Sequence, residues 1–145
     1  MALASVAALY TPQVLMLATS LVSYPLDEAL PLQGHARSAS CGSSLRVALA
    51  LDASGAIDRI GVAAQACAIG QAATAIMLGA AKGLALEDFR RAETALQNWL
   101  SGEGDLPDWP GLHVLEPARA FAGRHGAILL GWQAVINAFS SADAA

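Results

Sequence analysis

The segment around Cys67 constrains the fold most, because the spacing of apolar residues changes there. Before it, SLRVALALDASGAIDRIGVAAQ (44–65) carries apolar residues such as Leu45, Val47 and Leu49 at every second position, which is the period of a half-buried strand. After it, AIGQAATAIMLGAAKG (68–83) carries them at helical spacing. The sequence therefore predicts that a strand ends and a helix begins near Cys67.

The strand segment contains a turn and is predicted to be a β-hairpin. The turn is DASG (52–55), and Ile60, Val62 and Ala64 alternate again after it. Cys41 precedes the first strand of this hairpin and Cys67 follows the second. Because a hairpin returns the chain to the end where it started, both cysteines are expected at the same end of the sheet.

The remaining segments predict helices and one short edge strand. Thr11 and Pro12 form a good helix start, and this helix should end before Pro25. The predicted class is α+β, with a small antiparallel three-stranded sheet packed against several helices in a single domain, 1–145. Its expected parts are an edge strand within 34–44, helices at about 87–100 and 125–139, a short helix opened by Pro117, a core over about 10–139 and a frayed tail at 140–145.

Composition narrows the function classes. The chain has 145 residues, 55% of them hydrophobic and 14% charged, and a net charge of −4 without a block of Lys or Arg. Nucleic acid and anionic membrane surfaces are therefore not expected as partners. No charge precedes Asp27, but polar residues and Pro12 interrupt this run, which favours a buried helix over a membrane span or signal peptide. Two cysteines favour a reduced, cytoplasmic setting, with a single disulfide as the alternative.

Cys67 is a candidate metal or sulfur ligand because it immediately precedes a helix. The N-terminal end of a helix favours an anion, including a thiolate. Small neighbours leave room for a ligand at Cys67, and Gly42 does the same beside Cys41. The alternative is that either cysteine is a small buried hydrophobic residue. For His125, at the start of an apolar helix, the alternative is a capping or internally bonded histidine.

Three segments resemble the U-type iron–sulfur cluster assembly scaffolds, that is, IscU, SufU and the N-terminal domain of NifU. The segment SASCGSSLRVALALDASGAIDRI resembles the family's first-cysteine loop and hairpin. The segment AQACAIGQAATAIMLGAAKG resembles its second-cysteine helix, and GRHGAILLGWQAV resembles the region of its third cysteine. The resemblance extends from about Tyr10 to Phe139.

This resemblance implies a site and a set of partners. In the family, three cysteines with an aspartate, and in some members a histidine, hold a nascent [2Fe–2S] cluster, or zinc in its absence. By position, Cys41 and Cys67 match the first two cysteines and His125 matches the histidine next to the third. The implied partners are a cysteine desulfurase, recipient apo-proteins and, as an open alternative, a second copy of the chain in a homodimer.

The chain departs from the family pattern at its ligand positions. Gly126 replaces the third cysteine, and Ser43 replaces the aspartate two positions after the first. The polar stretch after the first helix has become SYPLDEA, and DLPDWPG only partly matches the family's chaperone-recognition motif. Iron–sulfur clusters ordinarily take four protein ligands, whereas this chain offers two thiolates and one imidazole.

Three hypotheses follow. The first is a scaffold that holds iron or a nascent cluster through Cys41, Cys67 and His125, and passes it on without being an enzyme. The second is a metal-free interaction partner that regulates the desulfurase or pairs with an intact scaffold, as the changes at Ser43 and Gly126 suggest. The third, ranked last because the third thiol is absent, is a zinc-assisted sulfur acceptor that carries a persulfide.

Overall fold

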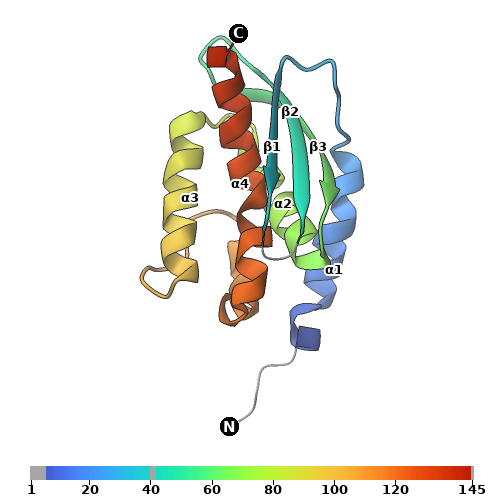
Figure 1. The fold of residues 1–145 in the computed structure, drawn as a ribbon, viewed down its shortest axis with the longest axis vertical. Coiled ribbons are helices and arrows are strands. Elements are labelled where there is room, and N and C mark those ends of the chain that lie inside the picture. The colour runs from blue at the N-terminus through green and yellow to red at the C-terminus, as the bar shows by residue number, and fades with distance from the viewer. Residues whose placement is uncertain (1–5, 40–41, 145) are drawn as a thin grey trace.

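A computed structural model describes residues 6–39 and 42–144 and contains one open sheet with helices on one side (Figure 1). Three antiparallel strands stand in the order β1-β2-β3. The α+β class and the three-stranded sheet predicted from the sequence are confirmed. The strands are β1 (Leu32–Arg37), β2 (Ser44–Leu51) and β3 (Ile57–Gln65), and the α-helices are α1 (Pro12–Thr19), α2 (Ala68–Ala81), α3 (Leu86–Leu100) and α4 (His125–Ser140).

The hairpin between β2 and β3 forms as predicted. Its strands pair from Ser44 opposite Gln65 up to Leu51 opposite Ile57, with one irregularity in the register beside Leu51. The turn is closed by the carboxylate of Asp52, which accepts hydrogen bonds from the backbone N–H groups of Ser54 and Ala56. The start of β2 therefore lies beside the end of β3, which leads into α2.

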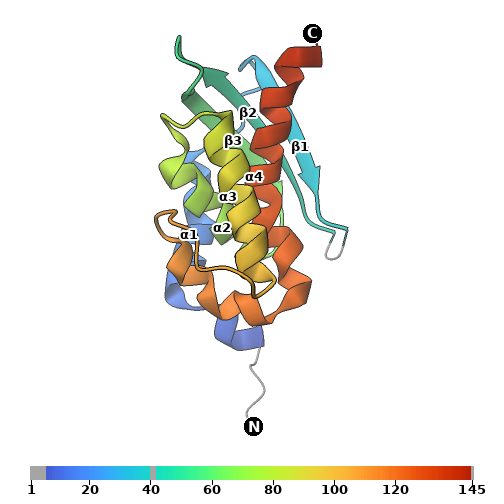
Figure 2. The same cartoon turned by 90° about the vertical axis from the view of Figure 1, so that its left-hand side faces the viewer.

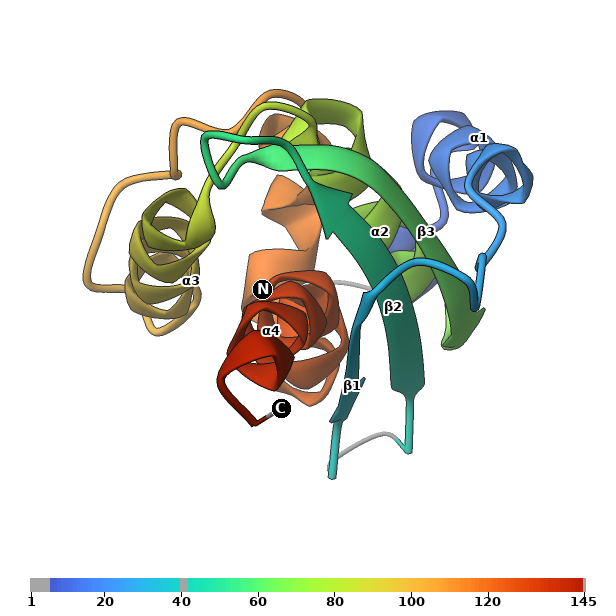
Figure 3. The ribbon, with the colours of Figure 1, turned by 90° about the horizontal axis from the view of Figure 1, so that it is seen from above.

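The helices form two further layers behind the sheet. Helix α4 packs across β1 and β2, and α2 packs between α4 and α1. Helix α3 lies on the outer side of α4, away from the sheet, in two perpendicular views (Figures 2 and 3). Close contact of β1 with α4 depends on Gly34, since a β-carbon there would collide with the backbone of Ala134 and Ala138. Residues far apart in the sequence thus meet along α4.

The core lies between the sheet and the helices. It is built from alternate residues of β2 and from the inner faces of all four helices, because these faces carry the apolar residues at strand and helix spacing. Its largest fully buried side chains are Trp132, Phe89, Leu9, Leu45, Leu49, Ile57, Ile69, Met77, Leu96, Leu112, Leu115 and Ile128. Since α2 and α4 are buried over most of their length, their positions are fixed by packing.

The predicted start of α1 is confirmed in detail. The hydroxyl of Thr11 accepts a hydrogen bond of 3.1 Å from the backbone N–H of Val14, and Pro12 is the first helical residue. A 3-10 helix, η2 (Ser20–Ser23), continues from α1 and ends before Pro25. Capping by Thr11 satisfies one of the N–H groups that the first helical turn leaves without a partner.

Two predictions about the C-terminal part differ from the structure. Pro117 does not open a helix but lies inside a 3-10 helix, η3 (Leu112–Ala120), which starts after Gly111 with a positive φ of 91°. Proline fits there because its fixed φ of about −65° matches that of a 3-10 helix. Beyond α4, where the sequence predicts a frayed tail, Ser141–Ala144 add another 3-10 helix, η5.

Within residues 6–39 and 42–144, no helix combines the length and the apolar character needed to cross a membrane.

Candidate metal and sulfur site

Cys67 occupies the N-cap of α2, at the point where β3 gives way to the helix. Its backbone is extended, with φ −64° and ψ 168°, and its carbonyl accepts a hydrogen bond of 2.9 Å from the N–H of Gln71. The residue is half-buried and its thiol is free of any disulfide. In the part of the chain that the structure describes, the side chain makes no capping bond to the helix, so the sulfur is available to a ligand.

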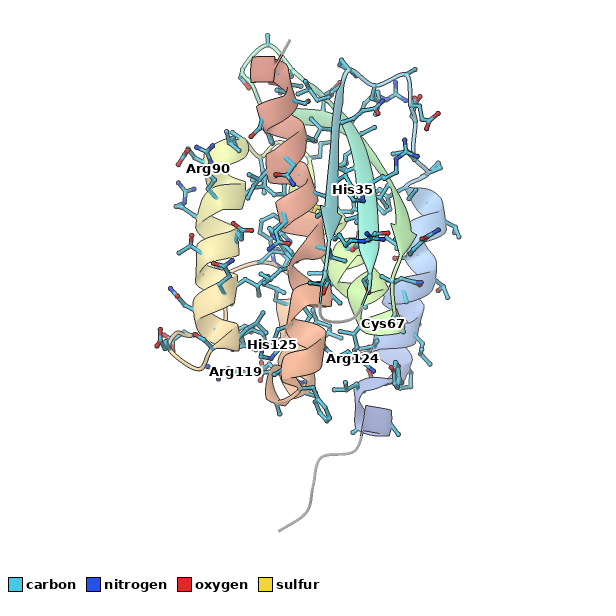
Figure 4. All side chains as sticks on the ribbon, in the orientation of Figure 1. His35, Cys67, Arg90, Arg119, Arg124 and His125 are labelled. Atoms are coloured by element: carbon cyan, nitrogen blue, oxygen red, sulfur yellow. The ribbon has the colours of Figure 1, made fainter. Side chains whose placement is uncertain are left out.

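His125 is the first residue of α4 and is also half-buried. Its Nε2 lies 2.7 Å from the backbone carbonyl oxygen of Arg119. Figure 4 shows Cys67, Arg124 and His125 at the same end of the molecule. His125 is therefore bonded within the chain at Nε2, as the alternative reading of this residue expects. Its Nδ1 is left for a different partner.

The N-terminal turns of α2 and α4 are in contact. A β-carbon added to Gly70 would lie 3.2 Å from the Cβ of Ala127. Because Gly70 is three residues after Cys67 and Ala127 two residues after His125, this contact brings both helix starts together. Neither first turn contains an acidic residue. The two positive helix ends therefore reinforce one another and favour negatively charged ligands there.

Cys41 falls outside the described residues, so its proximity to Cys67 stays a prediction. The residues that follow it are described. Gly42 has a positive φ of 71°, and the loop is closed by bonds from Ser38 N–H to Ser43 O (2.8 Å) and from Gly42 N–H to Ser38 O (3.0 Å). Ser44, the first residue of β2, pairs with Gln65, which lies two positions before Cys67. The C-terminal side of this loop therefore lies at the Cys67 end of the sheet, as the hairpin argument requires.

Ser43 and Gly126 stand where the family pattern has an aspartate and a cysteine. Ser43 is buried, with 4% of its surface exposed, and Gly126 supplies no side chain. Among the described residues, no three His, Cys, Asp or Glu side chains are grouped so that they could hold a metal ion. A metal at this end would therefore need Cys41 or a ligand from outside the chain.

Sequence reasoning missed two arginines at this end. Arg119 donates from Nε to Trp99 O (2.6 Å) and from Nη2 to Gly104 O (3.3 Å), and its guanidinium lies 5.3 Å from the centre of the Trp99 ring. Arg124 is the N-cap of α4, and its buried Nε has no hydrogen-bond partner among the described residues. No motif reveals these roles, because the bonds of Arg119 join η3 to residues that lie 20 and 15 positions earlier in the chain.

A cavity of the molecule lies elsewhere. It has a volume of about 900 Å³ and is lined by residues that include Asp27, Asp58, Arg59 and Lys82. Lys82 caps the C-terminal end of α2, opposite Cys67. Since α2 has 14 residues, these two ends are about 20 Å apart, and the cavity is separate from the candidate site.

Comparison with solved structures places the fold among known proteins. A nitrogen-fixing NifU-like protein (N-terminal) from Brucella abortus is similar with a TM-score of 0.84 and 24% identity, over 94% of this chain and 95% of that one. A candidate iron–sulfur cluster assembly scaffold protein for the SUF system from Fervidobacterium islandicum is similar with a TM-score of 0.75 and 19% identity, over 93% and 99%. No protein-family model matches the chain, and no curated protein matches its sequence.

These likenesses cover nearly the whole of each chain. The resemblance to U-type scaffolds drawn from three sequence segments is therefore confirmed at the level of the fold. At such identities, what the shared fold does in this chain depends on its own residues.

Proposed function

We propose that the chain is an iron–sulfur cluster assembly scaffold-like protein that binds iron or a nascent [2Fe–2S] cluster through Cys41, Cys67 and His125. The cluster is cargo, received as iron and sulfur and passed to recipient apo-proteins, so the chain is not an enzyme. Sulfur would come from a cysteine desulfurase. Zinc would take the same ligands when iron is absent, because it also prefers thiolate and imidazole donors.

One observation carries this proposal: the helix starts that bear Cys67 and His125 touch through Gly70 and Ala127. Soft thiolates and an imidazole suit iron–sulfur clusters and zinc. The absence of acidic residues from both first turns favours the negative charge that thiolates and sulfide bring. The shared fold of a scaffold candidate for the SUF system supports the same reading.

Two thiolates and one imidazole are one ligand short of the usual four. A water, a small thiol or a group from a second protein would complete the set. Such a site holds its cargo less firmly than one with four protein ligands, which suits a protein that transfers the cluster onward.

Anaerobic reconstitution with ferrous iron and sulfide tests the proposal. The wild type should retain visible charge-transfer absorption after desalting, and Cys41→Ser, Cys67→Ser and His125→Ala should each lose most of it. His113→Ala is the matched control, because His113 is exposed on η3. A wild type that keeps no colour, or a Cys41→Ser variant with an unchanged spectrum, would overturn the proposal.

The buried Ser43 and the bare Gly126 favour a second candidate function, a metal-free partner of the desulfurase or of an intact scaffold. The chain would then keep the fold as an interaction surface. Capture of a purified cysteine desulfurase by protein that contains neither iron nor zinc, and that gains none on reconstitution, would favour this function over the first.

A further inference from the structure

The hydrogen bond made by His125 fixes where its ring carries a proton. Nε2 lies 2.7 Å from the carbonyl oxygen of Arg119. A carbonyl oxygen only accepts hydrogen bonds, so Nε2 must be the donor. In the neutral ring the proton then sits on Nε2, and the lone pair that can bind a metal lies on Nδ1.

The accepting carbonyl belongs to a residue whose own side chain is firmly held. The guanidinium of Arg119 donates to the carbonyls of Trp99, at the end of α3, and of Gly104, in the following loop. It also lies against the ring of Trp99, which is only 3% exposed. Hydrogen bonds from a charged donor are stronger than neutral ones. The segment from Arg119 to His125 is therefore tied to the C-terminal end of α3.

Resting on the proposed function, we infer that Arg119 is a positioning residue that presents Nδ1 of His125 as the metal-binding atom. Its side chain anchors its backbone to α3, and its carbonyl then orients the imidazole and selects the Nε2–H tautomer. Metal-binding histidines commonly donate their second ring N–H to such a carbonyl, and this bond fixes both the ring orientation and the tautomer.

The first test reads the tautomer of His125 directly, in the metal-free full-length protein, by long-range ¹H–¹⁵N NMR of the imidazole. The wild type should show neutral His125 with its proton on Nε2. Arg119→Met, which keeps an unbranched side chain but loses both hydrogen bonds, should give a mixture of tautomers. Arg119→Lys keeps the charge without the forked donors, and its Nε2–H tautomer fraction should lie between those of the wild type and Arg119→Met.

Arg90→Met is the matched control, because Arg90 is exposed on α3 and pairs only with Glu87 among the described residues. Arg90→Met should give the same His125 spectrum as the wild type. A spectrum measured on folded protein separates loss of positioning from loss of stability, since unfolded chains give a distinct, averaged imidazole signal.

The second test measures affinity for Zn²⁺. Arg119→Met should bind zinc more weakly than the wild type, by at most about 10-fold, because the carbonyl that orients His125 remains but loses its anchor; complete removal of an outer partner costs roughly 10-fold to 100-fold. Arg90→Met should bind as the wild type does.

A proton on Nδ1 in the wild type, or an unchanged tautomer in Arg119→Met, would overturn this inference. Where the wild type binds zinc, equal zinc affinity in Arg119→Met would also overturn it. If instead the tautomer responds as expected while the wild type binds neither zinc nor iron, the proposed function fails and the orienting role of Arg119 stands on the NMR result.

Discussion

At the starts of α1 and α3, side chains accept hydrogen bonds from backbone N–H groups, whereas the N-caps of α2 and α4 make no side-chain hydrogen bond within the described residues. Thr11 accepts from Val14 N–H at the start of α1, and Asp88 accepts from Ala85 N–H (2.8 Å) at the start of α3. Within the described residues, the N-caps of α2 and α4 make no such side-chain bond. Helix α2, whose N-cap is Cys67, thus begins without a side-chain cap, whereas α4 continues from a 3-10 helix, η4 (Ala122–Arg124), in which the carbonyl of Ala122 accepts from His125 N–H.

This difference separates residues that stabilise a helix start from Cys67, which is proposed to bind a ligand. Capping and charge compensation each stabilise a helix by up to about 1–2 kcal/mol. Within the described residues, both are absent from the start of α2, a cost that a bound anionic group would offset. The proposed site therefore lies beside a helix start, that of α2, whose N-cap makes no side-chain hydrogen bond among the described residues.

The largest effect is expected from separating the starts of α2 and α4. Gly70→Val should lower the free energy of unfolding by about 1–3 kcal/mol, because the new side chain would crowd Ala66 and Ala127, and it should also weaken zinc binding. Gly79→Val is the matched control on the same helix, since a β-carbon at Gly79 meets nothing within 4 Å. Chemical denaturation and zinc titration measure both effects. Equal stability of the two variants would contradict the contact between the helices.

Substitutions at the N-caps of α1 and α2 should change the free energy of unfolding by smaller amounts and in opposite directions. Thr11→Ala removes a cap that is in use and should cost about 1 kcal/mol of stability while metal binding is retained. Cys67→Ser places a good capping residue at an N-cap that lacks a bond. It should raise the stability of the metal-free protein by roughly 0.5 kcal/mol while abolishing metal binding. Denaturation of the metal-free proteins, with binding measured separately, checks both. A stabilised Thr11→Ala variant would remove the contrast.

The smallest effect concerns the far end of the sheet and appears only in acid. Hydrogen bonds from the Ser54 side chain, then from the backbone of Ala56 and Ser54, lower the pKa of Asp52. Because the folded pKa lies below the unfolded value of about 3.9, this stabilisation is complete above that pH. It is lost as pH falls through the folded pKa.

Asp52→Asn should therefore lose this acid-dependent part of the stability curve and leave metal binding unchanged. Ser54→Ala should shift the curve in the same direction by removing the largest contribution. Thermal unfolding measured between about pH 5 and pH 2 reads the effect. Parallel curves for the wild type and Asp52→Asn would show that this carboxylate does not stabilise the turn.

Much of the fold could be predicted from local pattern. Thr11 and Pro12 define the start of α1, and alternation in 45–51 with the DASG turn defines the hairpin, because these signals depend only on neighbouring residues. Pro117 was misplaced because its preference for a first turn is local, whereas the start of η3 is set by Gly111. Of the candidate site, the Cys67 N-cap and the His125 helix start were predicted, and the position of Cys41 is still a prediction.

The sequence by itself determined the order of elements, the change of period at Cys67 and the residue types that could bind a metal. These properties follow from spacing along the chain and need no knowledge of distant contacts. Only the tertiary structure decided that Gly70 lies against Ala127, and that Arg119 joins the end of α3 to the ring of His125. Such contacts depend on how whole helices pack, since the packing brings together backbone groups that no local pattern relates.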